Sequence, residues 1–169
     1  MSTRCQIEFK HIQQLNTKTK KIVERRTIYR HSDGYPEGVI PDLKLFLKWN
    51  SGRNGDIEYQ VANFIYWSKR RVEEAYFNKK YDGSIENSKL KWADNQQTNM
   101  SQLHTGFGIC ENDEYHCDIE YFYVVEREVS GKENKVMTKI IRYKVEAKDW
   151  SNPITKKNLK LVSETIIDE

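Results

Sequence analysis

Four side chains that could bind or activate an anion are concentrated in one short segment. Arg30, His31, Asp33 and Tyr35 lie within six residues, where a predicted strand ends and a predicted helix begins. Loops in such places often carry binding sites, and an arginine together with the first amides of a helix can hold a phosphate. The segment therefore predicts a site for an anionic, nucleotide-like ligand. A purely structural turn at Asp33 and Gly34 is the alternative.

Arg4 is the fifth candidate ligand-binding residue. Residues 3–10 alternate polar and apolar side chains, which is typical of a half-buried strand. If this strand pairs with the predicted strand at Ile22 to Arg30, Arg4 approaches the loop. Arg4 and Arg30 would then form a bidentate anion site. The alternative is that Arg4 lies on a solvated strand face.

Three classes of function fit these residues. The first is a non-enzymatic module that binds a nucleotide-like anion at the Arg30 to Tyr35 loop. The second is a metal-independent phosphodiesterase in which His31 is the acid or base and the arginines stabilise charge. The third is a protein-binding inhibitor whose anchors are exposed tryptophans, the candidates being Trp49, Trp67 and Trp92. Apart from the possible role of His31 in the second class, the sequence assigns no catalytic residue, and it implies no cofactor.

The cysteines and histidines favour neither a disulfide framework nor a metal site. The chain has three cysteines, Cys5, Cys110 and Cys117, and an odd number suits a reducing compartment. Cys110 and Cys117 are too far apart for a short zinc-binding pair, even with His104 and His116 nearby. We therefore expect no bound metal.

Length and charge narrow the class of protein further. A chain of 169 residues is typical of a single globular domain, here residues 1–169. The net charge of +3 is too small to indicate nucleic-acid binding, and no apolar run approaches the length of a membrane span. We expect a cytoplasmic protein, with homo-oligomer formation left open. The basic residues 18–30 are expected to pair with the acidic residues 111–126 across the sheet.

The periodicity of apolar residues predicts an α+β fold. Helical spacing runs from about Ile40 to Trp49 and from Asp56 to Tyr76, with Ile57, Val61, Phe64 and Ile65 on the buried face of the second helix. A terminal helix is expected after Pro153. Strands are predicted at residues 3–10, 22–30, 89–93, 103–110, 117–125 and 137–145. This order indicates a largely antiparallel sheet with two main helices packed on one face.

The first third of the chain resembles a mostly uncharacterised family of small proteins from phages, archaeal viruses and their hosts. The similarity lies in Ser2-Thr3-Arg4 and in the run from Ile28 to Val39, which reads IYRHSDGYPEGV. It extends more loosely to the Gly106 to Ile109 and Tyr121 to Tyr123 segments. The resemblance implies a viral or mobile-element protein in the host cytoplasm. It also implies an inhibitor of host defence or a binder of a host protein.

Overall fold

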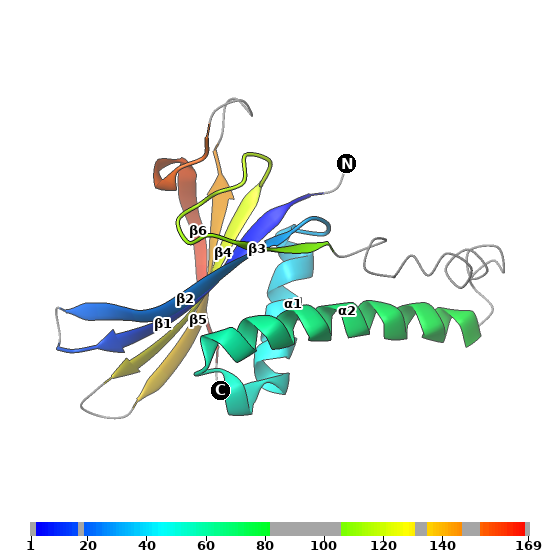
Figure 1. Cartoon of the computed structure of the whole chain (residues 1–169), viewed down its shortest axis with the longest axis horizontal. Coiled ribbons are helices and arrows are strands. Elements are labelled where there is room, and N and C mark those ends of the chain that lie inside the picture. Colours follow the sequence, from blue (N-terminus) through cyan, green and yellow to red (C-terminus); the bar gives the residue numbers. More distant parts are fainter. Residues whose placement is uncertain (1–2, 17–18, 82–105, 131–134, 147–152, 168–169) are drawn as a thin grey trace.

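A computed structural model of the chain describes residues 3–16, 19–81, 106–130, 135–146 and 153–167 (Figure 1). The elements in chain order are β1 (Cys5–Gln14), β2 (Lys20–Arg30), α1 (Pro36–Trp49), η1 (Ser51–Arg53), α2 (Ile57–Tyr81), β3 (Phe107–Cys110), β4 (Tyr121–Ser130), β5 (Val136–Val145), η2 (Lys156–Asn158) and β6 (Leu159–Ile167). No helix within these ranges is long and apolar enough to cross a membrane.

The six strands form one sheet in the order β3-β2-β1-β4-β5-β6. β1 lies at the centre, antiparallel to β2 and parallel to β4, and every other pairing is antiparallel. Figure 1 shows the sheet strongly twisted, with α1 and α2 on the same side of it. The predicted α+β class, a largely antiparallel sheet with two helices on one face, is confirmed.

An aromatic core joins the helices to the sheet. In β1, Cys5, Ile7 and Phe9 alternate toward this side and are fully buried. Phe9 contacts Phe46 of α1 and Phe64 of α2, with ring centroids 6.3 and 5.5 Å away. We call this side of the sheet the helix face. The predicted buried positions of α2 are confirmed, since Ile57, Val61 and Phe64 lie in this core and Ile65 packs against it.

The opposite side, which we call the helix-free face, has its own apolar cluster. Its buried members are Ile119, Phe122, Val124, Ile141 and Ile154. Ile119 belongs to the connection between β3 and β4, and Ile154 precedes β6. This face is therefore covered by connecting segments rather than by helices, and the connection after β3 brings polar residues onto the sheet.

The predicted starts of α1 and β4 are wrong. α1 begins at Pro36 rather than near Ile40, because the Tyr35 carbonyl already accepts the Gly38 and Val39 amides. β4 begins at Tyr121, since residues 117–120 still belong to the connecting segment.

The segment after Pro153 ends in a strand, β6, instead of a helix. Its register shifts by one residue between Arg142 and Tyr143 of β5, which leaves Val162 as an extra residue. That bulge changes the phase of the apolar positions and makes the spacing of Leu159, Val162 and Ile166 look helical. The strand predicted at residues 89–93 lies outside the described residues.

Replacement of Phe64 by alanine tests how α2 is docked. Phe64 is fully buried, whereas Tyr66 on the same helix is 55% exposed. We expect Phe64→Ala to lower the free energy of unfolding by about 3–5 kcal/mol, because it leaves a cavity in the aromatic core. Tyr66→Ala, the matched control, is expected to cost less than about 1 kcal/mol. Urea unfolding followed by circular dichroism measures both, and equal losses would contradict this packing.

Candidate functional site

The pairing register of β1 and β2 separates the two arginines predicted to act together. Cys5 lies opposite Arg30, and Gln6 lies opposite Tyr29. Because directly opposite residues share a face, Arg30 points to the helix face with Cys5. Arg4, one residue earlier in the chain, lies on the helix-free face. The strands pair as expected, but the two guanidinium groups do not form a bidentate site.

Arg30 is committed to the structure of the loop. It is only 5% exposed. Its Nε donates to the Ser32 carbonyl at 2.9 Å, and a terminal nitrogen lies 3.2 Å from a carboxylate oxygen of Asp42 on α1. A buried arginine with these partners ties the end of β2 to the first helix. We expect Arg30 to contribute to stability rather than to contact a ligand.

The rest of the loop is a fixed turn. Asp33 is exposed and has a φ of 55°, in the left-handed region. Gly34 is buried, donates from its amide to the Thr3 carbonyl, and accepts from the Tyr123 hydroxyl, both at 2.9 Å. Tyr35 is 41% exposed and precedes α1. The turn at Asp33 and Gly34 is thus the structural alternative that the sequence offered.

The start of α1 is poorly suited to an anion. Pro36 has no amide hydrogen, and the amides of Gly38 and Val39 both donate to the Tyr35 carbonyl. Glu37 adds a negative charge in the first turn. Most of the backbone amides that were expected to help bind a phosphate at this helix end are therefore not available as donors.

Five polar side chains from distant parts of the chain meet instead on the helix-free face. Asp118 is the centre: Arg4 Nε lies 3.3 Å from its Oδ2, and the Tyr29 hydroxyl donates to the same oxygen at 3.0 Å. His31 Nδ1 lies 3.3 Å from the Tyr29 hydroxyl oxygen. The His116 ring stacks on Tyr29 with centroids 4.4 Å apart. We call these five residues the histidine cluster.

The hydrogen bonds of the cluster fix the roles of its members. A phenol has one proton, so if Tyr29 donates it to Asp118, the contact with His31 requires Nδ1–H to donate to Tyr29. Nε2 of a neutral His31 then carries the lone pair, as in a base oriented by a second group. Burial and the bond to Asp118 raise the pKa of Tyr29. Tyr29 therefore stays protonated and acts as a link rather than as a base.

Arg4 differs from Arg30 in having unused donors. Its side chain is 36% exposed. Among the described residues, its two terminal nitrogens have no hydrogen-bond partner, and its Nε, although near Asp118, lacks hydrogen-bond geometry. His31 and His116 are both exposed. The cluster therefore presents one guanidinium and two imidazoles to solvent.

Of the predicted ligand-binding residues, Arg4 and His31 come together and Arg30, Asp33 and Tyr35 do not join them. Sequence reasoning missed Tyr29, His116 and Asp118. For His116 and Asp118 the one signal was the acidic stretch at residues 111–126, which was expected to pair with the basic stretch at 18–30. One such pair forms: Arg25 bonds to Asp113, in the connection between β3 and β4, through both terminal nitrogens.

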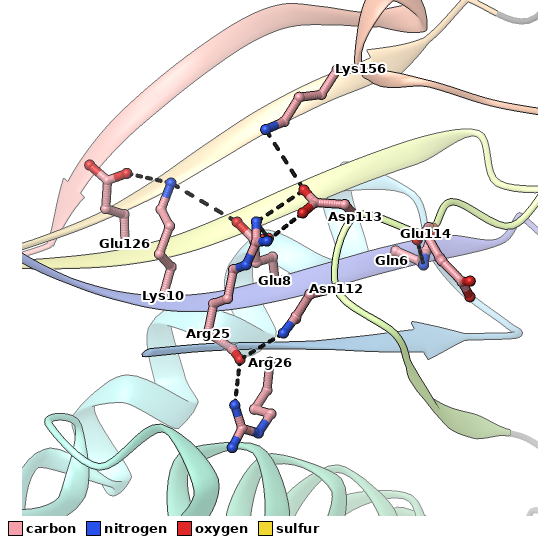
Figure 2. A network of polar contacts seen from close by, with 10 residues as sticks. All are labelled: Gln6, Glu8, Lys10, Arg25, Arg26, Asn112, Asp113, Glu114, Glu126 and Lys156. Atoms are coloured by element: carbon pink, nitrogen blue, oxygen red, sulfur yellow. Dashed lines mark hydrogen bonds and ion pairs between the residues drawn. The ribbon is translucent and has the colours of Figure 1, made fainter. Parts of the chain in front are cut away.

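The segment that carries His116 and Asp118 is held against β1 by the side chain of Gln6. The Gln6 side-chain amide is fully buried. It donates to the Glu114 carbonyl at 2.9 Å and accepts from the His116 amide at 3.1 Å. Figure 2 shows the bond from Gln6 to Glu114 together with the Arg25 to Asp113 pair on the same connection. Two strands thus hold the connection in place.

Arg25 also belongs to a row of alternating charges that crosses the helix-free face (Figure 2). Lys10 lies between Glu8 at 4.0 Å and Glu126 at 2.7 Å, and Arg25 lies 3.8 Å from Glu8. Lys139 extends the row to Glu126 at 3.1 Å. Glu8 and Glu126 are 8% and 6% exposed. The row replaces an apolar core at this end of the face.

The other surface features of the described residues are less suited to binding an anion than the histidine cluster is. A hollow of about 770 Å³ lies beside Arg25 and Asn112, but its main cations already have acidic partners, such as Asp113 for Arg25 and Glu58 for Arg26. In the described part of the chain, no three His, Cys, Asp or Glu residues come close enough to hold a metal ion.

The tryptophans proposed as anchors differ in exposure. Trp49 is 54% exposed, while Trp67 packs against the aromatic core. Trp92 and His104 lie outside the described residues. Only Trp49 is therefore available as an anchor among the tryptophans that the structure describes.

Comparison with known proteins gives no independent guide to the site. No protein-family model, curated protein or solved structure matches this chain.

Replacement of Gly34 by alanine tests the close contact that sets the loop against β1. A Cβ at Gly34 would lie 2.8 Å from the Arg4 carbonyl carbon and the Cys5 nitrogen, which are backbone atoms. We expect Gly34→Ala to lower the free energy of unfolding by about 2 kcal/mol or more. A Cβ at Gly52 meets no atom within 4 Å, so Gly52→Ala is the control in the same urea titration. A harmless Gly34→Ala would contradict the contact.

Acid titration tests the row of charges. Burial alone would raise the pKa of Glu126, but its bonds to Lys10 and Lys139 outweigh burial and lower it. Glu126 therefore stabilises the fold above its ordinary pKa of 4.5, and this stabilisation is lost as the pH falls through the lower folded value. We expect Glu126→Gln to cost about 2–3 kcal/mol at pH 7 and much less near pH 3.

Glu8 is the matched control for that titration. Burial raises its pKa, and the charges of Lys10 and Arg25 only partly offset the effect. Ionised Glu8 thus costs folding energy above its raised pKa, and protonation relieves that cost as the pH falls. Glu8→Gln should therefore cost less than Glu126→Gln at pH 7. The opposite order of the two variants would refute this assignment of charges.

Proposed function

We propose that this protein binds a small, anionic, nucleotide-like ligand at the histidine cluster. The observation that carries the proposal is the state of Arg4: within the described structure its terminal nitrogens have no partner, and it lies on the same face as two exposed imidazoles. A guanidinium with unused donors is the best side chain for planar recognition of phosphate. Asp118 forms an ion pair with the Nε side of this guanidinium, so the two terminal nitrogens remain for a ligand.

The aromatic members favour a nucleotide over a simple inorganic anion. His116 is exposed and stacks on Tyr29, which itself is half-buried. Stacked rings at the surface give a flat support on which a base can lie, and such stacking is tolerant of base identity. A nucleotide with its phosphate at Arg4 and its nucleobase near His116 would use both the guanidinium and the stacked rings of the cluster.

A second candidate function, a metal-independent phosphodiesterase, is favoured by the orientation of His31. Its Nδ1 is held by the Tyr29 hydroxyl, which in turn is held by Asp118. In the neutral ring with its proton on Nδ1, the basic lone pair is on Nε2, which is the nitrogen a general base would use. In this version His31 removes a proton from the attacking hydroxyl or water, whose oxygen bonds to phosphorus as the P–O bond to the leaving group breaks and that group takes a proton from solvent, while Arg4 stabilises the phosphate charge. The family resemblance, with its link to host-defence inhibitors, is compatible with either version.

Calorimetric titration with adenosine monophosphate, 3′,5′-cyclic adenosine monophosphate and a cyclic dinucleotide tests the proposal. We expect binding of at least one of these and none of adenosine, which lacks the phosphate. Arg4→Ala should weaken binding tenfold or more, because charge-assisted hydrogen bonds contribute about 1.5–3 kcal/mol. His31→Ala should reduce turnover about a hundredfold if product is formed, and affinity alone if none is.

Arg53→Ala is the matched control, since the Arg53 side chain is 61% exposed and its ion-pair partner is Asp56 in the next turn of the chain. It should bind as the unmodified protein does. If Arg4→Ala and Arg53→Ala bind the nucleotides equally well while both remain folded by circular dichroism, the histidine cluster is not the binding site.

A further inference from the structure

The two edges of the sheet are built differently, and one of them is suited to pairing. β6 is nine residues long and, among the described residues, no strand pairs with its outer side. Three of its apolar side chains are exposed: Leu161 by 53%, Val162 by 45% and Ile166 by 66%. A long edge strand with exposed apolar residues is a template for addition of another strand.

The opposite edge is protected. β3 is four residues long and covers only residues 27–30 of β2. The remainder of β2 carries a bulge opposite His11 and Ile12 of β1. The Arg25 carbonyl there is already bonded by the side chains of Arg26 and Asn112, at 2.8 and 3.4 Å. Bulges and capped carbonyls are common devices against strand addition.

The outward backbone groups of β6 follow from its pairing with β5. The Glu146 amide donates to the Asn158 carbonyl on the β6 side, and the Val145 amide donates to the Glu120 carbonyl on the β4 side. Because the backbone groups of successive strand residues point to alternate sides, those of Lys144 and Arg142 point toward β6, as those of Glu146 do. Their partners Lys160 and Ser163 therefore direct their backbone groups inward.

The outward set consists of the residues that alternate with these inward positions on each side of the bulge. On one side of the bulge they are Leu159 and Leu161, and on the other side they are Glu164 and Ile166. Their side chains all lie on the helix-free face, opposite residues 145, 143, 141 and 139 of β5. The bulge at Val162 thus separates two pairs of outward residues that are placed symmetrically about the middle of the strand.

We propose that two copies of this chain pair through β6 in antiparallel orientation. A two-fold axis between Val162 and Ser163 maps the outward set onto itself: Leu159 lies opposite Ile166 of the second copy, and Leu161 opposite Glu164. This register uses the backbone groups of all four residues, whereas registers shifted by one to five residues use at most two. The result is a continuous sheet of twelve strands with its helix-free faces on one side.

The side chains are compatible with this register. Ile166, the most exposed apolar residue of β6, is covered by Leu159 of the second copy, so the two apolar residues shield each other. Leu161 lies beside Glu164, whose carboxylate is 3.5 Å from Lys139 of its own chain. No like charges are placed directly opposite each other in this register. The pairing therefore covers exposed apolar surface without a new electrostatic cost.

Proline substitution at Glu164 gives the most specific test. The Glu164 amide faces outward, so Glu164→Pro removes a donor that only the second copy would use. We expect the unmodified protein to sediment at twice the 20.1 kDa mass of one chain at micromolar concentration, and Glu164→Pro to sediment as a monomer. Glu164→Ala removes the same carboxylate but keeps the amide, and it should remain a dimer.

Two lysine variants guard against a fold defect caused by proline. Ile166→Lys should also give a folded monomer. Ile109→Lys, at a β3 residue that is 79% exposed on the opposite edge, should stay dimeric. A monomeric unmodified protein, or dimers that persist in Ile166→Lys, would overturn the proposal. So would dissociation by Ile109→Lys alone.

Discussion

The pairing of β1 with its two neighbours is the constraint on which the rest of the structure depends. β1 lies between β2 and β4 along its whole length, and its alternation assigns each side chain to one face. Phe9 enters the aromatic core while Glu8 and Lys10 enter the row of charges. A shift of one residue in this register would exchange the two sets. Burial of Phe9 therefore also determines that Arg4 lies on the helix-free face.

The same constraint explains why the loop after β2 and the histidine cluster are distinct. The loop at residues 32–35 is fastened to Thr3, just before β1, by the Gly34 amide, and Arg30 ties it to α1. These contacts use the groups that a ligand would need. The cluster, in contrast, is assembled from three segments and keeps the outer donors of Arg4 exposed. Structural and ligand-binding roles are thus divided between neighbouring residues.

The sequence was sufficient to predict elements in which one period dominates. β1 and α2 have clear alternation or helical spacing, and their buried faces are those expected. β6 was misassigned because a single bulged residue, Val162, disguises a period of two as helical spacing. The cluster could be predicted only in part. Arg4 and His31 belong to conspicuous segments, whereas His116 and Asp118 are placed by a long-range bond to Gln6 that no local pattern reveals.

Nuclear magnetic resonance of the histidine ring nitrogens tests the central claim, that the cluster on the helix-free face binds a nucleotide-like anion. His31 should carry its proton on Nδ1 in the free, neutral ring. Addition of adenosine monophosphate should move the ring signals of His31 and His116 together. His11, on the helix face beside Arg127, should not move. Movement of His11 alone, or no movement of His31 and His116 at saturating nucleotide, would contradict the account.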